Sequence, residues 1–222
     1  MLGEVKAIGR NDLCYCGSGY KYKKCCMNDK FSLWKKNADV ILRNEPNGEQ
    51  IKSIFFELLD YIDRNRWQGA CHATASILFI LLSEIGLKPN LCIGMVKIDK
   101  GFFEHSWIEI NNNIYDVAIF LALEGYSFPP VIKNCNIDTT NNTELFYGWN
   151  KWEYGNDTFE HINYLLEVSI VEFMDNCPNF PNGLWDILIE LGNKLNIPIE
   201  IETLKNKYEE TLWTLKCETL MK

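Results

Sequence analysis

The sequence predicts an α+β protein with a small metal-binding head. Stretches with apolar residues at helical spacing come first, a group of strand-like stretches joined by a tight turn follows, and helical patterns return near the end of the chain. Four of the nine cysteines lie within residues 14–26. These observations favour one domain, residues 31–222, in which a buried helix packs on a small antiparallel sheet, preceded by a separate head of residues 1–30.

Length and composition fit this division. A chain of 222 residues that is 47% hydrophobic can form one well-packed core and a small appendage, but not two full-sized domains. The longest apolar stretch, ILFILL at residues 77–82, is far below membrane-spanning length. We therefore expect a cytoplasmic protein with no membrane partner.

Charge is unevenly divided along the chain. Residues 1–30 hold six basic and three acidic side chains and carry a charge of +3. The net charge of the chain is −8, so the remaining 192 residues carry −11. The acidic body argues against broad nucleic-acid binding. Tyr20 and Tyr22 are interleaved with lysines, but a divalent metal ion bound by the four clustered cysteine thiolates would offset most of the positive charge of the head, so nucleic acid is not an expected partner.

The cysteine cluster at residues 14–26 has the composition of a structural zinc site. An odd total of cysteines, two of them adjacent, fits poorly with a disulfide framework, and the spacing is not that of a Cys-x-x-Cys redox pair. Four thiolates complete the tetrahedral shell that structural Zn²⁺ prefers, and residues 17–19 (GSG) allow the necessary chain reversal. We assign the ligands as Cys14, Cys16, Cys25 and Cys26. A head with so few aliphatic residues should depend on the metal to fold.

The segment IGRNDLCYCGSGYKYKKCC, matched over residues 9–26, closely resembles the SEC-C motif, a zinc knuckle found at the tail of the SecA translocation ATPase and in other bacterial proteins. All four cysteines agree with the motif. Leu13 and Tyr15 stand where the family usually has proline, and Tyr20 where it usually has lysine. The resemblance implies a structural Zn²⁺ and a docking role toward a protein partner.

The helices expected in the body are core elements. Amphipathic patterns predict helices over 31–45 and 49–65, the first broken by Pro46, Asn47 and Gly48. Residues 70–89 are apolar on nearly every side from Ala73 to Ile85, which predicts a helix buried within the domain.

Strands are expected next, at 91–98, 105–110 and 113–121, with a hairpin turn at the asparagines of 111–113. Residues 122–165 are rich in proline, asparagine and aromatic residues and are expected to wrap irregularly over the sheet. The tail is expected to be helical in both GLWDILIELGNKL and IETLKNKYEETLWTLKCETL, with Pro198 between them.

Cys71 differs from the other cysteines outside the head in its position. It lies at the start of the buried helix, where free amides and the helix dipole favour a thiolate, as a cysteine nucleophile requires. His72 should point about 100° away around the helix. His105 opens a strand that can approach the helix start, so it is the candidate general base and acid.

An acidic partner for His105 is expected on the next strand. If the hairpin turn centres on residues 111 and 112, position 116 lies near position 107, which brings Asp116 close to His105. The Gln68 side chain and the Cys71 amide are the candidate oxyanion donors. His161, beside a glutamate in an aromatic-rich stretch, is expected to be structural.

Residues 67–120 resemble the core of the transglutaminase-like and papain-like cysteine superfamily. QGACHATASILFILLSEIGLKPNLCIGMV is similar to its nucleophile helix and following strand, and HSWIEINNNIYDVA to its histidine and aspartate hairpin. The resemblance implies a catalytic triad of Cys71, His105 and Asp116. Val117 stands where many members have proline, and His72 where several have arginine or another polar residue.

Three functions remain open at this level. The first is amide hydrolysis, as by a protease or amidase, through a thioester on Cys71, with exposed aromatics such as Trp149 and Trp152 favouring a peptide or protein substrate. The second is an inactive adaptor, in which the knuckle docks a protein partner and the core serves as a scaffold. The third is acyl transfer to an amine, as in transglutaminases and arylamine acetyltransferases, because fold alone does not fix the reaction.

Overall fold

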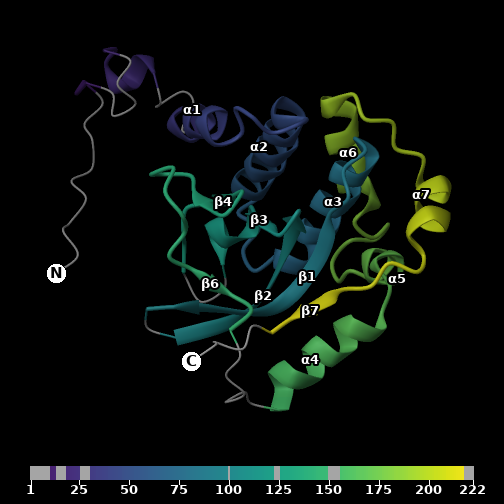
Figure 1. Ribbon diagram of the computed structural model, residues 1–222. Coiled ribbons are helices and arrows are strands. Elements are labelled where there is room, and N and C mark those ends of the chain that lie inside the picture. Colours follow the sequence, from purple (N-terminus) through teal and green to yellow (C-terminus); the bar gives the residue numbers. More distant parts are fainter. Residues whose placement is uncertain are drawn as a thin grey trace.

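A curled seven-stranded sheet forms the centre of the structure, a computed structural model that describes residues 11–13, 19–25, 31–99, 101–122, 126–149 and 156–217 (Figure 1). The strand order is β5-β4-β3-β2-β1-β6, and β7 also pairs with β1. The strands are β1 (Asn90–Ile98), β2 (Gly101–Ile110), β3 (Asn113–Asp116), β4 (Val131–Ile132), β5 (Cys135–Asn136), β6 (Phe146–Tyr147) and β7 (Thr214–Lys216).

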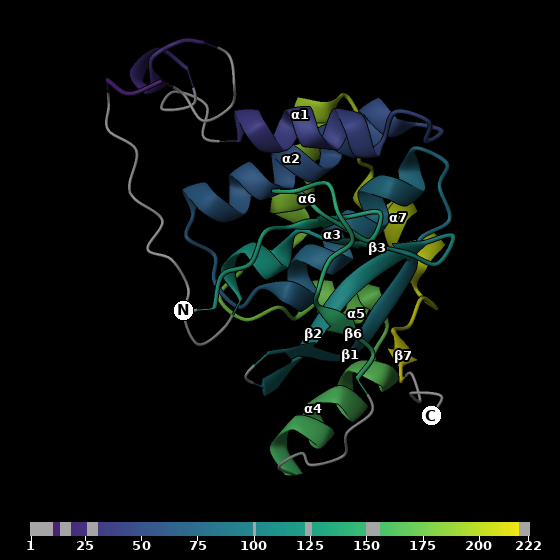
Figure 2. The ribbon, with the colours of Figure 1, turned by 60° about the vertical axis from the view of Figure 1, so that its left-hand side comes forward.

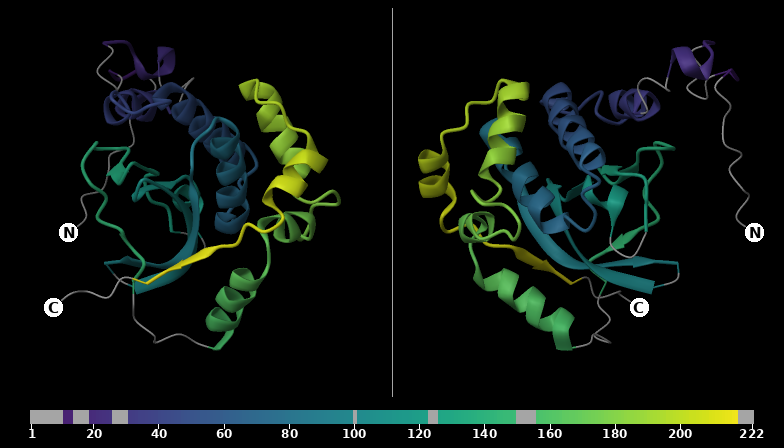
Figure 3. Two further views of the ribbon diagram at one scale, coloured as in Figure 1. Left: turned by 45° about the vertical axis from the view of Figure 1, so that its right-hand side comes forward. Right: turned by 180° about the vertical axis from the view of Figure 1, so that it is seen from behind.

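Helices pack around this sheet at both ends of the molecule. Helices α1 and α2 lie at one end and α4 at the other, with β1 and β2 between them (Figures 2 and 3). The helices are α1 (Ser32–Ile41), α2 (Gly48–Arg64), α3 (Cys71–Glu84), α4 (Asn156–Glu167), α5 (Ile170–Asp175), α6 (Trp185–Leu195) and α7 (Ile201–Tyr208), and two 3₁₀ turns are η1 (Tyr22–Lys24) and η2 (Ala118–Leu121).

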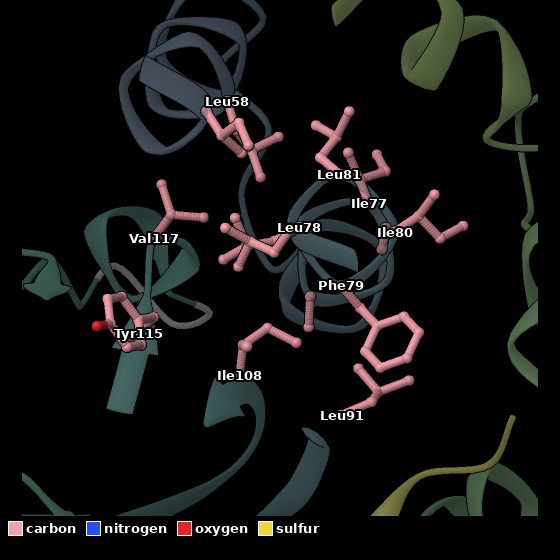
Figure 4. Packing of buried hydrophobic residues seen from close by; sticks show 14 of the residues in the cluster. Leu58, Ile77, Leu78, Phe79, Ile80, Leu81, Leu91, Ile108, Tyr115 and Val117 are labelled. Atoms are coloured by element: carbon pink, nitrogen blue, oxygen red, sulfur yellow. The ribbon is translucent and has the colours of Figure 1, made fainter. Parts of the chain in front are cut away.

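Helix α3 occupies the middle of the core. Every residue from Ala73 to Leu82 is buried, as its apolar character on all sides predicts. Leu58 of α2 lies on one side of α3, while Ile108 and Tyr115 of the sheet lie on the other (Figure 4). Since both sides of α3 are packed, its first residues are held in a fixed position relative to β2 and β3.

The β2–β3 hairpin has the expected turn and register. Asn111 and Asn112 both have positive φ, 51° and 61°, the backbone that a two-residue type I′ turn requires and that asparagine tolerates. Ile108 pairs with Tyr115, which puts position 116 beside position 107 as predicted. Pairing between β2 and β3 covers only residues 108–110 and 113–115, so β3 does not flank β2 at position 105.

Four expectations about secondary structure are wrong. The second strand begins at Gly101, so His105 lies within it and does not open it. The third strand ends at Asp116, and residues 118–121 form η2, because the Asp116 carboxylate accepts the amide of Ile119 and turns the chain. The segment 122–165 is not irregular throughout, since it contributes β4, β5, β6 and most of α4. The last predicted helix stops at Tyr208, and the chain continues into β7.

Residues 214–216 form a strand instead of continuing the predicted helix, because pairing with β1 is more stable for them. β7 pairs in parallel with β1 over residues 92–94 and covers an edge that β6 leaves open, so the sheet is antiparallel except for this pair. Trp213, just before β7, is only 4% exposed. Burial of this large side chain and the new strand pairing outweigh the local helical pattern. Within the described residues, no helix is long and apolar enough to cross a membrane.

Candidate active site

Cys71 is the first residue of α3 and is 7% exposed. The preceding residue, Ala70, occupies the N-cap position and has no side chain that could accept a hydrogen bond from the helix amides. The first turn of α3 therefore lacks a side-chain cap, and its amide dipoles favour negative charge at the position of the Cys71 sulfur.

The loop before α3 is tied to the segment that follows Asp116. The amide of Gly69 donates to the carbonyl of Leu121 at 3.0 Å, and Gly69 has a positive φ of 67°. Gln68 is exposed, and its side-chain Nε2 donates to the carbonyl of Ala122 at 3.0 Å. One Nε2 hydrogen of Gln68, the candidate oxyanion donor, is thus already used in a contact within the chain. Together the two contacts fix the start of α3 against the end of η2.

His105 and Asp116 are in direct contact. Nε2 of His105 lies 2.8 Å from Oδ2 of Asp116, and each residue is 2% exposed. The two positions are diagonal neighbours across the hairpin, within reach of side chains that share a face of the sheet. Because Nε2 is engaged, Nδ1 is the ring nitrogen of His105 left for other contacts.

Asp116 has two further donors, neither of which was predicted from the sequence. The hydroxyl of Tyr147 donates to Asp116 Oδ2 at 2.7 Å, and the amide of Ile119 donates to Oδ1 at 3.2 Å. Tyr147 is on β6, thirty-one residues from Asp116, so no local pattern could have revealed it. Burial and the nearby Asp116 charge raise the pKa of Tyr147 well above its ordinary value, so it remains a donor.

The electrostatics of Cys71 and His105 favour an ion pair. Burial lowers the pKa of His105, but the charge and hydrogen bond of Asp116, together with Cys71, raise it to about 10. Burial acts to raise the pKa of the Cys71 thiol, yet the charge of His72 and the hydrogen bond and charge of His105 lower it well below the usual range. The arrangement can therefore hold a thiolate beside an imidazolium.

His72 is held by two residues of β2. Its Nδ1 lies 2.8 Å from Oγ of Ser106 and its Nε2 lies 3.3 Å from Oε1 of Glu104, as expected for a different direction from Cys71. The two residues are consecutive, however, and the His72 ring still interacts electrostatically with the Cys71 thiol. Burial lowers the pKa of His72, but Cys71 and Glu104 together raise it to about 9.

His161, on α4, meets the same carboxylate. Its Nδ1 lies 2.9 Å from Oε1 of Glu104, and its ring centroid is 5.1 Å from that of His72. Burial acts to raise the pKa of Glu104, but its interactions with His161 and His72 lower it to about 2. Sequence reasoning missed Glu104 and Ser106, because no local pattern indicated that α3 and α4 would both contact this part of β2.

The described part of the head shows the chain reversal that the cysteine spacing requires. Leu13 forms an antiparallel bridge with Lys21, the amide of Tyr22 donates to the carbonyl of Asp12 at 2.8 Å, and Gly19 has a positive φ of 75°. The segments next to the two cysteine pairs therefore lie side by side, as a four-thiolate site needs. Of the four assigned ligands, only Cys25 is among the described residues.

Of the two aromatic residues expected to be exposed, only Trp149 lies within the described part of the chain. Trp149 is partly buried against the core, its amide donates to the carbonyl of Met95 at 3.0 Å, and Nζ of Lys97 lies 3.9 Å from its ring centroid. The expectation for Trp149 is wrong, and Trp152 lies outside the described residues.

Comparison with known proteins gives matches for two separate parts of the chain. A stretch of 21 residues, 10% of the chain, is 86% identical to the protein translocase subunit SecA of Syntrophomonas wolfei subsp. wolfei and spans 2% of that protein's length. No solved structure matches the chain. Residues 10–28 match the SEC-C motif and residues 52–119 match the transglutaminase-like superfamily, so the two likenesses stand in the expected order along the chain.

Proposed function

We propose that this protein is a cysteine-dependent acyl-transfer enzyme that hydrolyses an amide bond through Cys71, His105 and Asp116. The observation that carries the proposal is the buried contact of His105 with Asp116, 2.8 Å long, next to a thiol at the uncapped start of a helix. Cysteine nucleophiles need a base that is itself oriented by a third group, and this arrangement supports that use.

The proposed reaction has two halves. In the first, Cys71 is the nucleophile after His105 has taken its proton, and the sulfur attacks the carbonyl carbon of the amide. His105 then returns the proton to the departing amine as the carbon–nitrogen bond breaks, leaving a thioester on Cys71. In the second half, His105 takes a proton from water, the hydroxide oxygen attacks the thioester, and the acid product leaves as the sulfur is released and reprotonated.

Asp116 and Tyr147 act on this chemistry through His105. Asp116 keeps the imidazole in the orientation that directs Nδ1 toward the sulfur, and it stabilises the imidazolium. The Tyr147 hydroxyl and the Ile119 amide hold the carboxylate in turn. The Cys71 amide and the remaining Nε2 hydrogen of Gln68 are the proposed donors to the oxyanion.

An aromatic stack beside His105 supports a substrate with an apolar side chain. The ring of Phe103 lies edge-on to His105, with centroids 5.7 Å apart, and stacks with Tyr126 at 6.3 Å and Phe128 at 6.5 Å. Tyr126 is 39% exposed. An apolar residue of a peptide could cover this stack while its backbone carbonyl approaches Cys71, which favours a peptide or protein substrate.

For the head, we propose a structural Zn²⁺ held by Cys14, Cys16, Cys25 and Cys26, with a protein partner docking there. The bridge between Leu13 and Lys21 brings the segments next to the two cysteine pairs together, which supports a site closed by one ion. When bound, the ion supplies folding free energy and no catalytic chemistry, since four protein ligands leave no open position.

Reactivity of the thiols tests the nucleophile. Under limiting iodoacetamide, mapped by mass spectrometry, we expect Cys71 to be alkylated faster than the exposed Cys217, although Cys71 is 7% exposed. His105→Asn should slow labelling of Cys71 at least tenfold and leave Cys217 unchanged, with circular dichroism confirming that the variant is folded. Equal, slow labelling of both thiols in the wild type would instead favour the adaptor function, which the deep burial of Cys71 suits.

Acyl chemistry is tested separately with p-nitrophenyl acetate. We expect intact-mass spectra to show one added acetyl group, located on Cys71 and absent from Cys71→Ala. Adding methylamine distinguishes the two reactions, because transfer would give N-methylacetamide and hydrolysis gives acetate. Absence of the acetyl group from Cys71 in the folded wild-type protein would contradict the proposed enzyme.

A further inference from the structure

We propose that His72, Glu104 and His161 form a second metal site, distinct from the cysteine head, that binds a divalent transition metal such as Zn²⁺ and clips helix α4 to β2 and α3. One ligand atom from each residue lies within 4.8 Å of the others. The three residues come from three elements that are far apart in sequence, so only the fold brings them together.

The spacing of the ligand atoms fits a small ion. Two ligands, each about 2.0–2.1 Å from Zn²⁺ in a tetrahedral shell, lie roughly 3.4 Å from one another. Oε1 of Glu104 is 3.3 Å from Nε2 of His72 and 2.9 Å from Nδ1 of His161. Both distances from the carboxylate oxygen are therefore within about half an ångström of that spacing, and all three ligand atoms lie within 4.8 Å of one another.

The state of Glu104 Oε1 supports a cation at this position independently of the spacing. It is a buried atom that accepts no hydrogen bond, even though two imidazole nitrogens lie within 3.3 Å of it. A buried carboxylate oxygen without a hydrogen bond is costly, and a cation shared with both rings would satisfy it.

The surroundings are those of a metal-ligating histidine. Nδ1 of His72 is held by Oγ of Ser106 at 2.8 Å, which fixes the ring and leaves Nε2 directed at Glu104. A second hydrogen bond of this kind orients histidine ligands in metal sites. His161 has a side chain that is 49% exposed, so an ion can enter from solvent on that side and keep a water molecule in the fourth position.

The donor set selects the class of ion. Two imidazoles and one carboxylate suit Zn²⁺ and its neighbours in the first transition row, whereas Mg²⁺ and Ca²⁺ prefer shells made of oxygen alone. The site is next to Cys71, but its existence does not depend on acyl chemistry and it needs no reaction to be detected.

Zinc content of the full chain tests the site. After equilibration with Zn²⁺ and removal of the excess, elemental analysis should find one ion per chain fewer in His161→Ala than in the wild type. Tyr164→Ala is the matched control, because Tyr164 is on the same helix and 49% exposed, and it should retain the wild-type content. Glu104→Gln, which keeps the side-chain shape, should lose the same ion as His161→Ala.

Two further measurements separate this site from the head. Co²⁺ bound by thiolates gives intense charge-transfer absorption, so Cys25→Ser should lose this absorption. His161→Ala should keep it and lose only the weaker bands of cobalt bound to nitrogen and oxygen. Ser106→Ala should weaken zinc binding at the second site about 10- to 100-fold. Equal zinc content in wild type, His161→Ala and Glu104→Gln, all folded by circular dichroism, would overturn the proposal.

Discussion

At the scale of single residues, alternation along β2 separates two sets of contacts. His105 points to one face of the strand and contacts Asp116, while Glu104 and Ser106 point to the other face and contact His72. Cys71 and His72 are likewise consecutive on α3 but differ in direction by about 100°. Neighbouring residues in two short segments thus supply both the proposed triad and the proposed metal site.

Tyr147 should be a positioning residue for the triad. Tyr147→Phe removes the hydroxyl that donates to Asp116 Oδ2 and keeps the ring, whose centroid lies 5.0 Å from that of Trp107. We expect a loss of about 1–2 kcal/mol in the free energy of unfolding, measured by urea denaturation.

A readout beyond stability separates positioning from simple packing. Cys71 alkylation should slow in Tyr147→Phe, because the carboxylate that orients His105 is less well held. Tyr164→Phe is the control, since Tyr164 is 49% exposed and should change neither quantity. An alkylation rate in Tyr147→Phe equal to that of the wild type would show that the hydroxyl does not position His105.

At the scale of elements, β1 is the strand that organises the sheet. It pairs with β2 along its whole length, and its other edge is shared by β6 at residues 96–97 and β7 at residues 92–94. Gly94 lies where these pairings converge, opposite His105 on β2 and Lys216 on β7. Close approach of three strands at this point explains the need for a residue without a side chain.

Gly94→Ala should therefore destabilise the protein. A Cβ at this position would lie 2.6 Å from the backbone oxygen of Lys216 and 3.2 Å from the ring of Trp107, so β7 must move. We expect a loss of about 1–3 kcal/mol in the free energy of unfolding.

Gly101→Ala is the matched control on the neighbouring strand, because a Cβ there meets no atom within 4 Å. Its melting temperature should stay close to that of the wild type. Hydrogen exchange should also show faster exchange in β7 for Gly94→Ala alone. Similar melting temperatures for the two alanine variants would mean that β7 is not held against β1 as described.

At the scale of the whole molecule, the described part of the head contributes little to the core. Leu13 is 72% exposed and Tyr20 64% exposed, whereas Phe31, at the start of the body, is 6% exposed and belongs to the main core. Apolar burial that stabilises the body therefore begins near residue 31. The head must obtain its folding free energy elsewhere, and a bound Zn²⁺ is the proposed source.

Cys25→Ser should separate the two parts. We expect it to lower the zinc content by one ion per chain and to increase hydrogen exchange at the amides of Tyr22 and Cys25, which donate hydrogen bonds within the head. Calorimetry should show the main unfolding transition of the body within about 1–2 °C of the wild type, because no core residue is altered. A large fall in that transition would mean that the head and the body fold as one unit.

Much of the architecture follows from local patterns. Helix α3, buried on all sides, the paired asparagines of the β2–β3 turn and the register that puts Asp116 near position 107 could all be predicted, because each depends on residues close in sequence. The cysteine cluster and its likeness to the SEC-C motif were also evident from spacing and residue type.

Only the tertiary structure decided which residues from distant parts of the sequence contact these elements. Sequence alone could not show that Tyr147 would donate to Asp116, that His161 would meet Glu104, or that the tail would leave its helix to pair with β1. Such contacts join segments separated by tens of residues, and their free energy comes from burial and strand pairing that exist only once the core has formed. The sequence by itself therefore determined the central helix, the β2–β3 hairpin and the candidate nucleophile, histidine and aspartate, while the fold decided their supporting contacts and assembled the second cluster.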